Sequence, residues 1–209
     1  DIINITIPSW RYDVSIKEDI VEEIVRIHGY DNLPETPLPN TNISRIIPKD
    51  QKRVSDIKRL LASTGYDEVV TWSFMDSTKA KLFSSLKDEL TLQNPISSDL
   101  DYMRPSILPN LLKIANNNIN RSFHDLSLFE VGPIFENAGD KVITHACGIR
   151  TGSIAGKNSH GESRKFDIFD MKADIATTLE SVGLNINKCQ IKNNVPEYYH
   201  PTRSATLSL

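Results

Sequence analysis

The pattern of hydrophobic and polar residues changes its period along the chain, and each period predicts a different element. Alternation with a period of two over residues 2–7 predicts a β-strand, which Pro8 ends. From Ser15 onward the apolar residues recur at helical spacing, and Ser15 with Glu18 has the spacing of a capping box. The apolar stripe of this helix consists of Ile16, Ile20, Ile24 and Ile27. Gly29 follows the last isoleucine, so we expect the helix to end there in a left-handed turn.

Beyond residue 49 the pattern predicts helices and strands in mixed order. Helices are expected over 50–64, 77–86, 108–121 and 172–182. Strands are expected over 68–74, 90–93, 126–136 and 142–151, with further strand-like segments near the end. The order lacks the regular strand–helix–strand alternation of Rossmann and barrel folds, and the strands suggest an antiparallel set. We therefore expect the fold class to be α+β.

A proline-rich stretch separates the first helix from the rest of the chain. Prolines interrupt residues 34–48 among polar neighbours, at Pro34, Pro37, Pro39 and Pro48. Such a composition is typical of a linker, so we place a domain boundary at 38–48. The chain opens with Asp1 in a strand-like pattern and alternates again over 202–209, which suggests a piece of a longer protein.

Composition excludes several classes of protein. The 209 residues are 39% hydrophobic and 24% charged, which is too apolar for a fully disordered chain. The formal net charge of −3 argues against a strongly basic nucleic-acid-coating protein. No apolar run is long enough for a membrane span. The two cysteines, Cys147 and Cys189, are too few for a disulfide framework or a four-cysteine zinc site, so we expect a reducing, cytoplasmic location.

Common catalytic motifs are not supported. The loop 152–159 has two glycines and a lysine, but only three residues separate the glycines and Asn158 follows the lysine, so it does not fit a phosphate-binding loop. The five histidines show no metalloprotease spacing, and no serine or cysteine lies in a recognisable nucleophile motif.

Four acidic residues gather around the start of the first predicted helix. On a helix, Asp19, Glu22 and Glu23 share one face, and Asp13 lies just before it. Carboxylates this close repel one another, which favours a bound magnesium or calcium ion or a basic partner. The alternative is a solvated cluster that the helix dipole stabilises.

The predicted helix 50–64 carries a basic face. Its cations are Lys49, Lys52, Arg53, Lys58 and Arg59. This face would suit tRNA or an acidic partner surface, and the alternative is a solvated helix face.

Three segments resemble the family of bacterial phenylalanine–tRNA ligase β subunits. The first reads PSWRYD at 8–13 and EDIVEEIVRIHGYD at 18–31, similar to the family's P-S-x-R-x-D and D-x-x-E-E-x-x-R-x-x-G-Y-D. The second lies within 94–132 and contains MRPSILPNLL and LFEVG. The third pairs DIFDMKAD at 167–174 with HPTRSA at 200–205, where Thr202 replaces the family's usual glycine. The segments occur in the family's order along nearly the whole chain.

The resemblance implies a domain organisation. Residues 1–38 would be the C-terminal part of a winged-helix-like B5 domain, 39–48 a linker, and 49–209 a truncated B6–B7 module. The module would have the antiparallel sheet and flanking helices of a class II aminoacyl-tRNA synthetase core without its catalysis. The α subunit would bind ATP and charge tRNA(Phe), and the two subunits would form an (αβ)₂ heterotetramer in the cytoplasm. Residues 50–74 would pack on the α subunit.

The resemblance also implies site residues. Asp13, Asp19, Glu22 and Glu23 would bind a magnesium ion shared with the α subunit. No catalytic or nucleotide-binding residue is assigned, because strand 126–130 has apolar residues where a class II core places a phosphate-binding arginine. Two alternatives stay open: a tRNA- or DNA-binding module, and a stand-alone synthetase with its own ATP–pyrophosphate exchange.

Overall fold

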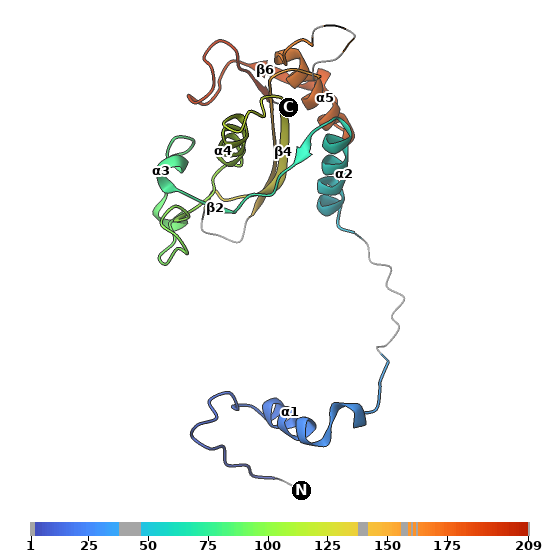
Figure 1. Cartoon of the computed structure of the whole chain (residues 1–209), viewed down its shortest axis with the longest axis vertical. Coiled ribbons are helices and arrows are strands. Elements are labelled where there is room, and N and C mark those ends of the chain that lie inside the picture. The colour runs from blue at the N-terminus through green and yellow to red at the C-terminus, as the bar shows by residue number, and fades with distance from the viewer. Residues whose placement is uncertain are drawn as a thin grey trace. The chain divides into compact units, whose positions relative to one another are not determined.

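The computed structural model describes residues 3–37, 47–137, 142–155 and 163–208, with residues 159 and 161 (Figure 1). The chain divides into two compact units, Asp1–Ile46 and Ile47–Leu209. The described residues contain no helix with the length and hydropathy needed to cross a membrane.

The first unit contains one long helix, α1 (Lys17–His28), followed by a short 3₁₀ helix (Tyr30–Asn32). The helix was predicted to start at Ser15 and begins two residues later. The predicted Ser15–Glu18 capping box is also wrong, because the N-cap is Ile16. The carboxylate of Asp19 accepts hydrogen bonds from the backbone N–H groups of Ser15 and Ile16, at 2.7 and 3.0 Å. Asp19 therefore satisfies the Ser15 N–H, which the Glu18 side chain was expected to satisfy. Gly29 ends the helix with φ of 92°, as predicted.

The predicted strand at 2–7 is wrong for its described residues, because 3–7 adopt no strand. A strand needs a hydrogen-bonded neighbour, and the described part of this unit contains no second strand to supply one. The isoleucine stripe of α1 is likewise uncovered within the unit. Ile16, Ile24 and Ile27 are all exposed, although their helical spacing is as predicted.

The second unit is built around a three-stranded sheet in the order β1–β4–β5. Its strands are β1 (Asp67–Glu68), β4 (Leu126–Ile134) and β5 (Ile143–Thr151). β4 and β5 form a nine-residue antiparallel pair, with Leu126 opposite Thr151. β1 pairs with β4 in parallel, so the sheet is mixed. The expectation that all strands are antiparallel is therefore wrong for β1. The α+β class itself is confirmed.

Helices cover both faces of the sheet (Figure 1). Successive side chains of β4 point to opposite faces, so neighbouring residues of this strand pack against different helices. Leu128 packs against α4 (Leu108–Ile119), together with Leu111. Phe129 packs on the other face against α2 (Lys49–Ser63), together with Leu61. The predictions for both helices are confirmed within two residues at each end.

The remaining elements are short, except for α5 (Ile168–Ser181), which packs against α2. They are α3 (Ser77–Ala80), 3₁₀ turns at Asp88–Leu90 and Ile186–Lys188, the pair β2 (Phe74–Met75) and β3 (Tyr102–Met103), and the pair β6 (Gln190–Lys192) and β7 (Thr206–Ser208).

Several predicted boundaries are wrong. The helix expected over 172–182 begins earlier, because Asp167 accepts the N–H of Phe169 at 2.8 Å and caps it. The helix expected over 77–86 ends at Ala80. The strand expected over 90–93 reduces to one bridge between Thr91 and Tyr102.

The strand expected over 68–74 divides into β1 and β2. Between them, the carbonyl of Trp72 accepts a hydrogen bond from the Asn110 side chain instead of a strand neighbour. The strand expected over 126–136 ends at Ile134.

Candidate functional site

Two of the four acidic residues predicted to bind magnesium meet at one arginine in the first unit. The Nη2 atom of Arg11 lies 2.7 Å from Oδ2 of Asp13 and 2.6 Å from Oε1 of Glu23. Arg26 adds a second cation to Glu23, at 2.9 Å. The positive charge between the two carboxylates is therefore that of Arg11.

The other two acids do not join this pair. The Asp19 carboxylate is directed at the start of α1, where it accepts the two backbone hydrogen bonds described above, and Glu22 is exposed. The described residues contain no group of three or more His, Cys, Asp or Glu side chains placed to hold a metal ion. The magnesium site thus stays a prediction, and this arrangement does not fit a metal held by these four acids alone.

Hydrogen bonds to Asp13, Asp19 and Glu23 lower the pKa values of these three carboxyl groups. The Arg11 guanidinium holds the pKa of Asp13 at about 2, below the ordinary 3.8. It also lowers the pKa of Glu23, and the backbone N–H groups of Ser15 and Ile16 lower that of Asp19. Because the carboxylate form is favoured in the folded unit, this ion pair contributes stability above the ordinary pKa and loses it as the pH falls through about 2.

Replacing Arg11 with methionine should therefore raise the pKa of Asp13 toward its ordinary 3.8. The side-chain carboxyl resonance of Asp13, followed by NMR between pH 1 and pH 6, measures this change. Lys17→Met is the charge-matched control, since Lys17 pairs with Glu18 and not with Asp13. An Asp13 midpoint that does not move in Arg11→Met would contradict the assignment of Arg11 as the cause.

A buried ion pair lies in the second unit, on the face of the sheet that α4 covers. Arg104 follows β3, Glu130 lies in β4, and their side chains are 1% and 4% exposed. Nη1 of Arg104 lies 2.7 Å from Oε1 of Glu130. Nε of Arg104 donates to the carbonyl of Pro133 at 2.7 Å. The pair therefore joins the end of β3 to two positions of β4.

Thr71 and Asn110 complete this network. Arg104 donates to the hydroxyl of Thr71 at 2.8 Å, and that hydroxyl donates to Oε2 of Glu130 at 2.7 Å. Asn110, in the first turn of α4, donates to the same hydroxyl at 3.1 Å. A Cβ at position 132 would lie 2.6 Å from Nη2 of Arg104, so a glycine is required there. The described residues contain no buried side-chain polar atom without a partner.

Sequence reasoning missed this network. The available signals were a glutamate inside a mostly apolar strand and a glycine two residues after it. A charged residue at a buried strand position indicates a buried partner of opposite charge. The pattern alone does not identify Arg104 as that partner, because the two residues come from different elements.

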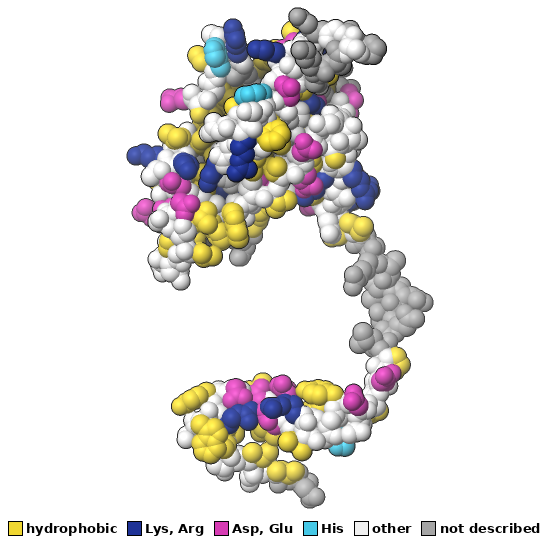
Figure 2. Space-filling view, in the orientation of Figure 1, with side chains coloured by type: hydrophobic (Ala, Val, Ile, Leu, Met, Phe, Trp, Pro, Cys, Tyr) yellow, Lys and Arg dark blue, Asp and Glu magenta, His cyan; other side chains and the backbone are white. Residues whose placement is uncertain are grey.

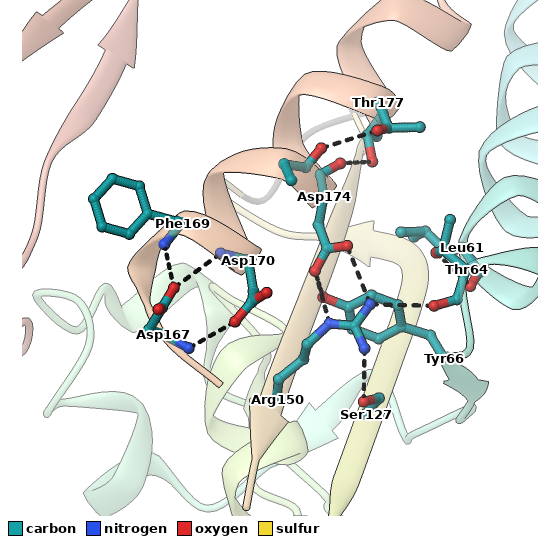
Figure 3. A network of polar contacts seen from close by, with 12 residues as sticks. Leu61, Thr64, Tyr66, Ser127, Arg150, Asp167, Phe169, Asp170, Asp174 and Thr177 are labelled. Atoms are coloured by element: carbon teal, nitrogen blue, oxygen red, sulfur yellow. Dashed lines mark hydrogen bonds and ion pairs between the residues drawn. The ribbon is translucent and has the colours of Figure 1, made fainter. Parts of the chain in front are cut away.

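A second network, centred on Arg150 of β5, lies on the other face of the sheet (Figure 3). Its guanidinium contacts both carboxylate oxygens of Asp174 in α5, at 2.7 and 3.1 Å. It also donates to the Ser127 hydroxyl at 3.0 Å and to the carbonyl of Thr64 at 3.2 Å. The Tyr66 hydroxyl donates to Asp174 at 2.7 Å, and the Tyr66 ring stacks on Arg150 at 4.0 Å.

The Arg150 network joins α2, β4, β5 and α5, so its role is to hold these elements together. Burial and the hydrogen bond to Asp174 raise the pKa of Tyr66 well above its ordinary value. Tyr66 therefore stays protonated and keeps donating across the physiological range.

The basic face of α2 is partly neutralised. Three of its five cations lie within 4 Å of a carboxylate, and Lys49 and Arg59 are exposed. The pairs are Lys52 with Asp56, Arg53 with Asp50, and Lys58 with Glu68. This pairing reduces the charge available to a nucleic acid.

Apolar side chains are also exposed on the segment between β1 and β2. Val70 is 84% exposed and Trp72 is 67% exposed. Residues two positions apart in an extended segment face the same side, so these two side chains lie on one surface. We call Val70 and Trp72 the apolar ridge. A tryptophan that exposed is typical of a surface that another molecule covers.

The two cysteines and the loop 152–159 were the remaining features considered in the sequence. Cys147 and Cys189 are both free and partly buried, and burial raises the pKa of the Cys147 thiol to about 11. The lysine of the loop 152–159 and its neighbours lie outside the described residues, as does His160. Figure 2 shows the described acidic, basic and hydrophobic side chains interspersed on the visible face of each unit.

Comparison with known proteins gives two family matches. The family model of the phenylalanyl tRNA synthetase beta chain CLM domain matches residues 33–209, and that of the tRNA synthetase B5 domain matches residues 1–30. The chain is 51% identical over 210 residues to the phenylalanine–tRNA ligase beta subunit of Rickettsia bellii, and 48% identical over 211 residues to that of Rickettsia typhi. Each alignment covers 100% of this chain, which spans 24% and 26% of the two relatives.

A solved structure supports the fold. The structure of a pyrrolysyl tRNA synthetase from Desulfitobacterium hafniense is similar with a TM-score of 0.53, over 73% of this chain and 52% of that one. At 15% sequence identity this likeness concerns the fold alone. It agrees with the synthetase-like core expected for the second unit.

Proposed function

The chain belongs to the family of phenylalanine–tRNA ligase β subunits, and from this premise we propose that it is a non-catalytic assembly part of such a subunit. The proposed partner is the α subunit, in an (αβ)₂ heterotetramer that attaches phenylalanine to tRNA(Phe) in the cytoplasm. ATP binds to the α subunit in this proposal and not to the present chain. The chain spans about a quarter of its relatives, so its share of the activity is that of one segment.

We propose that residues 1–38 are the C-terminal part of the B5 domain, 39–48 a linker and 49–209 the synthetase-like core. The division of the chain between Ile46 and Ile47 supports this organisation. Residues 39–46 lie outside the described residues, so the start of the linker rests on its prolines.

The Arg104 guanidinium, which lies beside β4, is fully occupied by partners within the chain. Arg104 and Glu130 are directed at each other in the interior. Arg104 also donates to Thr71 and to the carbonyl of Pro133, so its three kinds of partner all belong to the protein. A guanidinium that binds a transferring phosphate has to face the substrate instead.

The observation that carries the assembly role is the apolar ridge. Trp72→Glu places a charge at the centre of the proposed interface, where burying it without a partner is costly. We expect association with the matching α subunit to weaken at least tenfold, as measured by size-exclusion chromatography with light scattering on the mixed proteins. The unmodified chain should form a stable mixed complex.

Leu82→Glu is the matched control, because Leu82 is about as exposed as Trp72 and lies after α3. It should leave association unchanged. An equal loss in both variants, or none in Trp72→Glu, would mean that other parts of the β subunit supply the interface.

The rival proposal, a nucleic-acid-binding module, is less well supported because three of the five cations on α2 are paired. A filter-binding titration with tRNA over a series of salt concentrations separates the two. A steep salt dependence would indicate phosphate contacts.

We also propose that Asp13, Asp19, Glu22 and Glu23 contribute to a magnesium site that the α subunit completes. In the assembled enzyme, Asp19→Asn combined with Glu22→Gln should raise the magnesium concentration needed for tetramer stability. The measurement is the fraction of tetramer during a magnesium titration. Glu18→Gln is the control, an exposed acid in the same turn of α1. Unchanged magnesium dependence would remove this site from the proposal.

A further inference from the structure

A cavity of about 530 Å³ lies in the second unit, away from the apolar ridge. It is lined by the beginning of α4, the end of β4 and the middle of β5, and by residues of the segments 83–90 and 198–199. Its volume is in the range of small-molecule sites, and every residue that lines it lies within the described part of the chain.

Three aromatic rings form a wall of this cavity. The centroids of Phe83 and Tyr198 are 4.8 Å apart, and those of Tyr198 and Tyr199 are 4.9 Å apart. The rings are tilted by 49° and 42°, so they are not stacked face to face on one another. Contiguous aromatic rings at this spacing offer faces and edges to a further planar ring.

This wall belongs to none of the three buried hydrophobic clusters of the described residues. Both tyrosines keep part of their surface exposed, although burial already raises their pKa values. The two tyrosines are 40% and 45% exposed, so the rings stay accessible to a planar ligand.

Lys87 brings a cation to the polar part of the cavity, whose lining also includes the acid Glu136. Nζ of Lys87 donates to two uncharged oxygens, the carbonyl of Glu136 at 2.6 Å and Oδ1 of Asn137 at 2.7 Å. No carboxylate within the described residues neutralises it as an ion pair. Ser106 and the first residue of α4, a helix of twelve residues, also line the cavity, so the helix dipole adds partial positive charge.

We propose that this cavity binds a small aromatic carboxylate, with its ring against Phe83, Tyr198 and Tyr199 and its carboxylate directed toward Lys87 and the start of α4. The proposal is independent of assembly, because it uses no residue of the apolar ridge. It gives the non-catalytic core a ligand of its own.

The test uses phenylacetate as the probe on the 209-residue chain. Saturation-transfer-difference NMR should show transfer to its ring protons with a dissociation constant on the order of 1 mM. Cyclohexylacetate, which lacks the aromatic ring, and phenethylamine, which reverses the charge, should each bind at least fivefold more weakly. Cys147 lines the cavity, so phenylacetate should also slow its alkylation by iodoacetamide at pH 9.

Tyr198→Leu should weaken phenylacetate binding at least fivefold, while Phe169→Leu, at an exposed aromatic residue of α5, should not change it. Circular dichroism checks that both variants fold. Cys147 protection in the unmodified chain provides a measurement that requires no variant. Absence of transfer or of protection, or equal binding of phenylacetate and cyclohexylacetate, overturns the proposal.

Discussion

Replacing Arg104 with methionine is expected to lower the free energy of unfolding of the second unit by about 3–5 kcal/mol. The change leaves the Glu130 carboxylate in the interior without its cation, on a side chain that is 4% exposed. It also removes a donor from the Pro133 carbonyl and from the Thr71 hydroxyl. Because whole domains are stable by only about 5–15 kcal/mol, this loss is a large part of the total.

Urea denaturation followed by tryptophan fluorescence and circular dichroism measures this loss. The double variant Arg104→Met, Glu130→Leu should recover much of it, since an apolar pair leaves no buried charge unpaired. If Arg104→Met alone were as stable as the unmodified chain, the pair would not be buried as described. If the double variant were no better than the single one, unpaired charge would not be the cause.

Replacing Arg150 with methionine is the second large effect, with an expected loss of about 2–4 kcal/mol. Arg150 and Asp174 are 10% and 16% exposed, so water replaces the lost contacts only in part. The variant keeps an unbranched apolar stem between the Tyr66 and Phe166 rings but leaves Asp174, Ser127 and Thr64 without the guanidinium. The same denaturation experiment measures the loss.

Arg164→Met is the matched control for Arg150. Arg164 also forms a two-bond ion pair, with Asp170 at 2.7 and 2.6 Å, but its side chain is 58% exposed. Exposed pairs contribute little to stability, so we expect a much smaller loss than in Arg150→Met. Similar losses in the two variants would show that burial is not what makes the Arg150 network important.

Long periodic segments were predictable from the sequence, and short ones were not. The helices α2 and α4 and the strands β4 and β5 each extend over nine residues or more, so their periods are unambiguous. β1 and β2 have two residues each, and their extent depends on which neighbours accept their hydrogen bonds. The segment 3–7 has the alternating pattern of a strand, but the described part of its unit contains no second strand to pair with it.

The family resemblance drawn from the three segments is confirmed, whereas the networks behind those segments could not be predicted. Met103–Pro109 and Leu128–Gly132 were recognisable as family patterns. These two segments contact each other through Arg104 and Glu130. Predicting that contact requires knowing that the end of β3 lies beside β4. The placement of Asp13 and Glu23 on Arg11 likewise depends on the turn before α1.

The parallel pairing of β1 with β4 also has a kinetic consequence. β4 and β5 are neighbours in the chain, so closing their antiparallel pair constrains only a short loop. Asp67 and Leu128 are separated by β2, α3, β3 and α4, so their pairing requires a much longer loop to close. We therefore expect the β4–β5 hairpin to assemble first and β1 to dock late. The apolar ridge follows β1 directly, so the surface proposed for the partner would be the last part of the sheet to become ordered during folding.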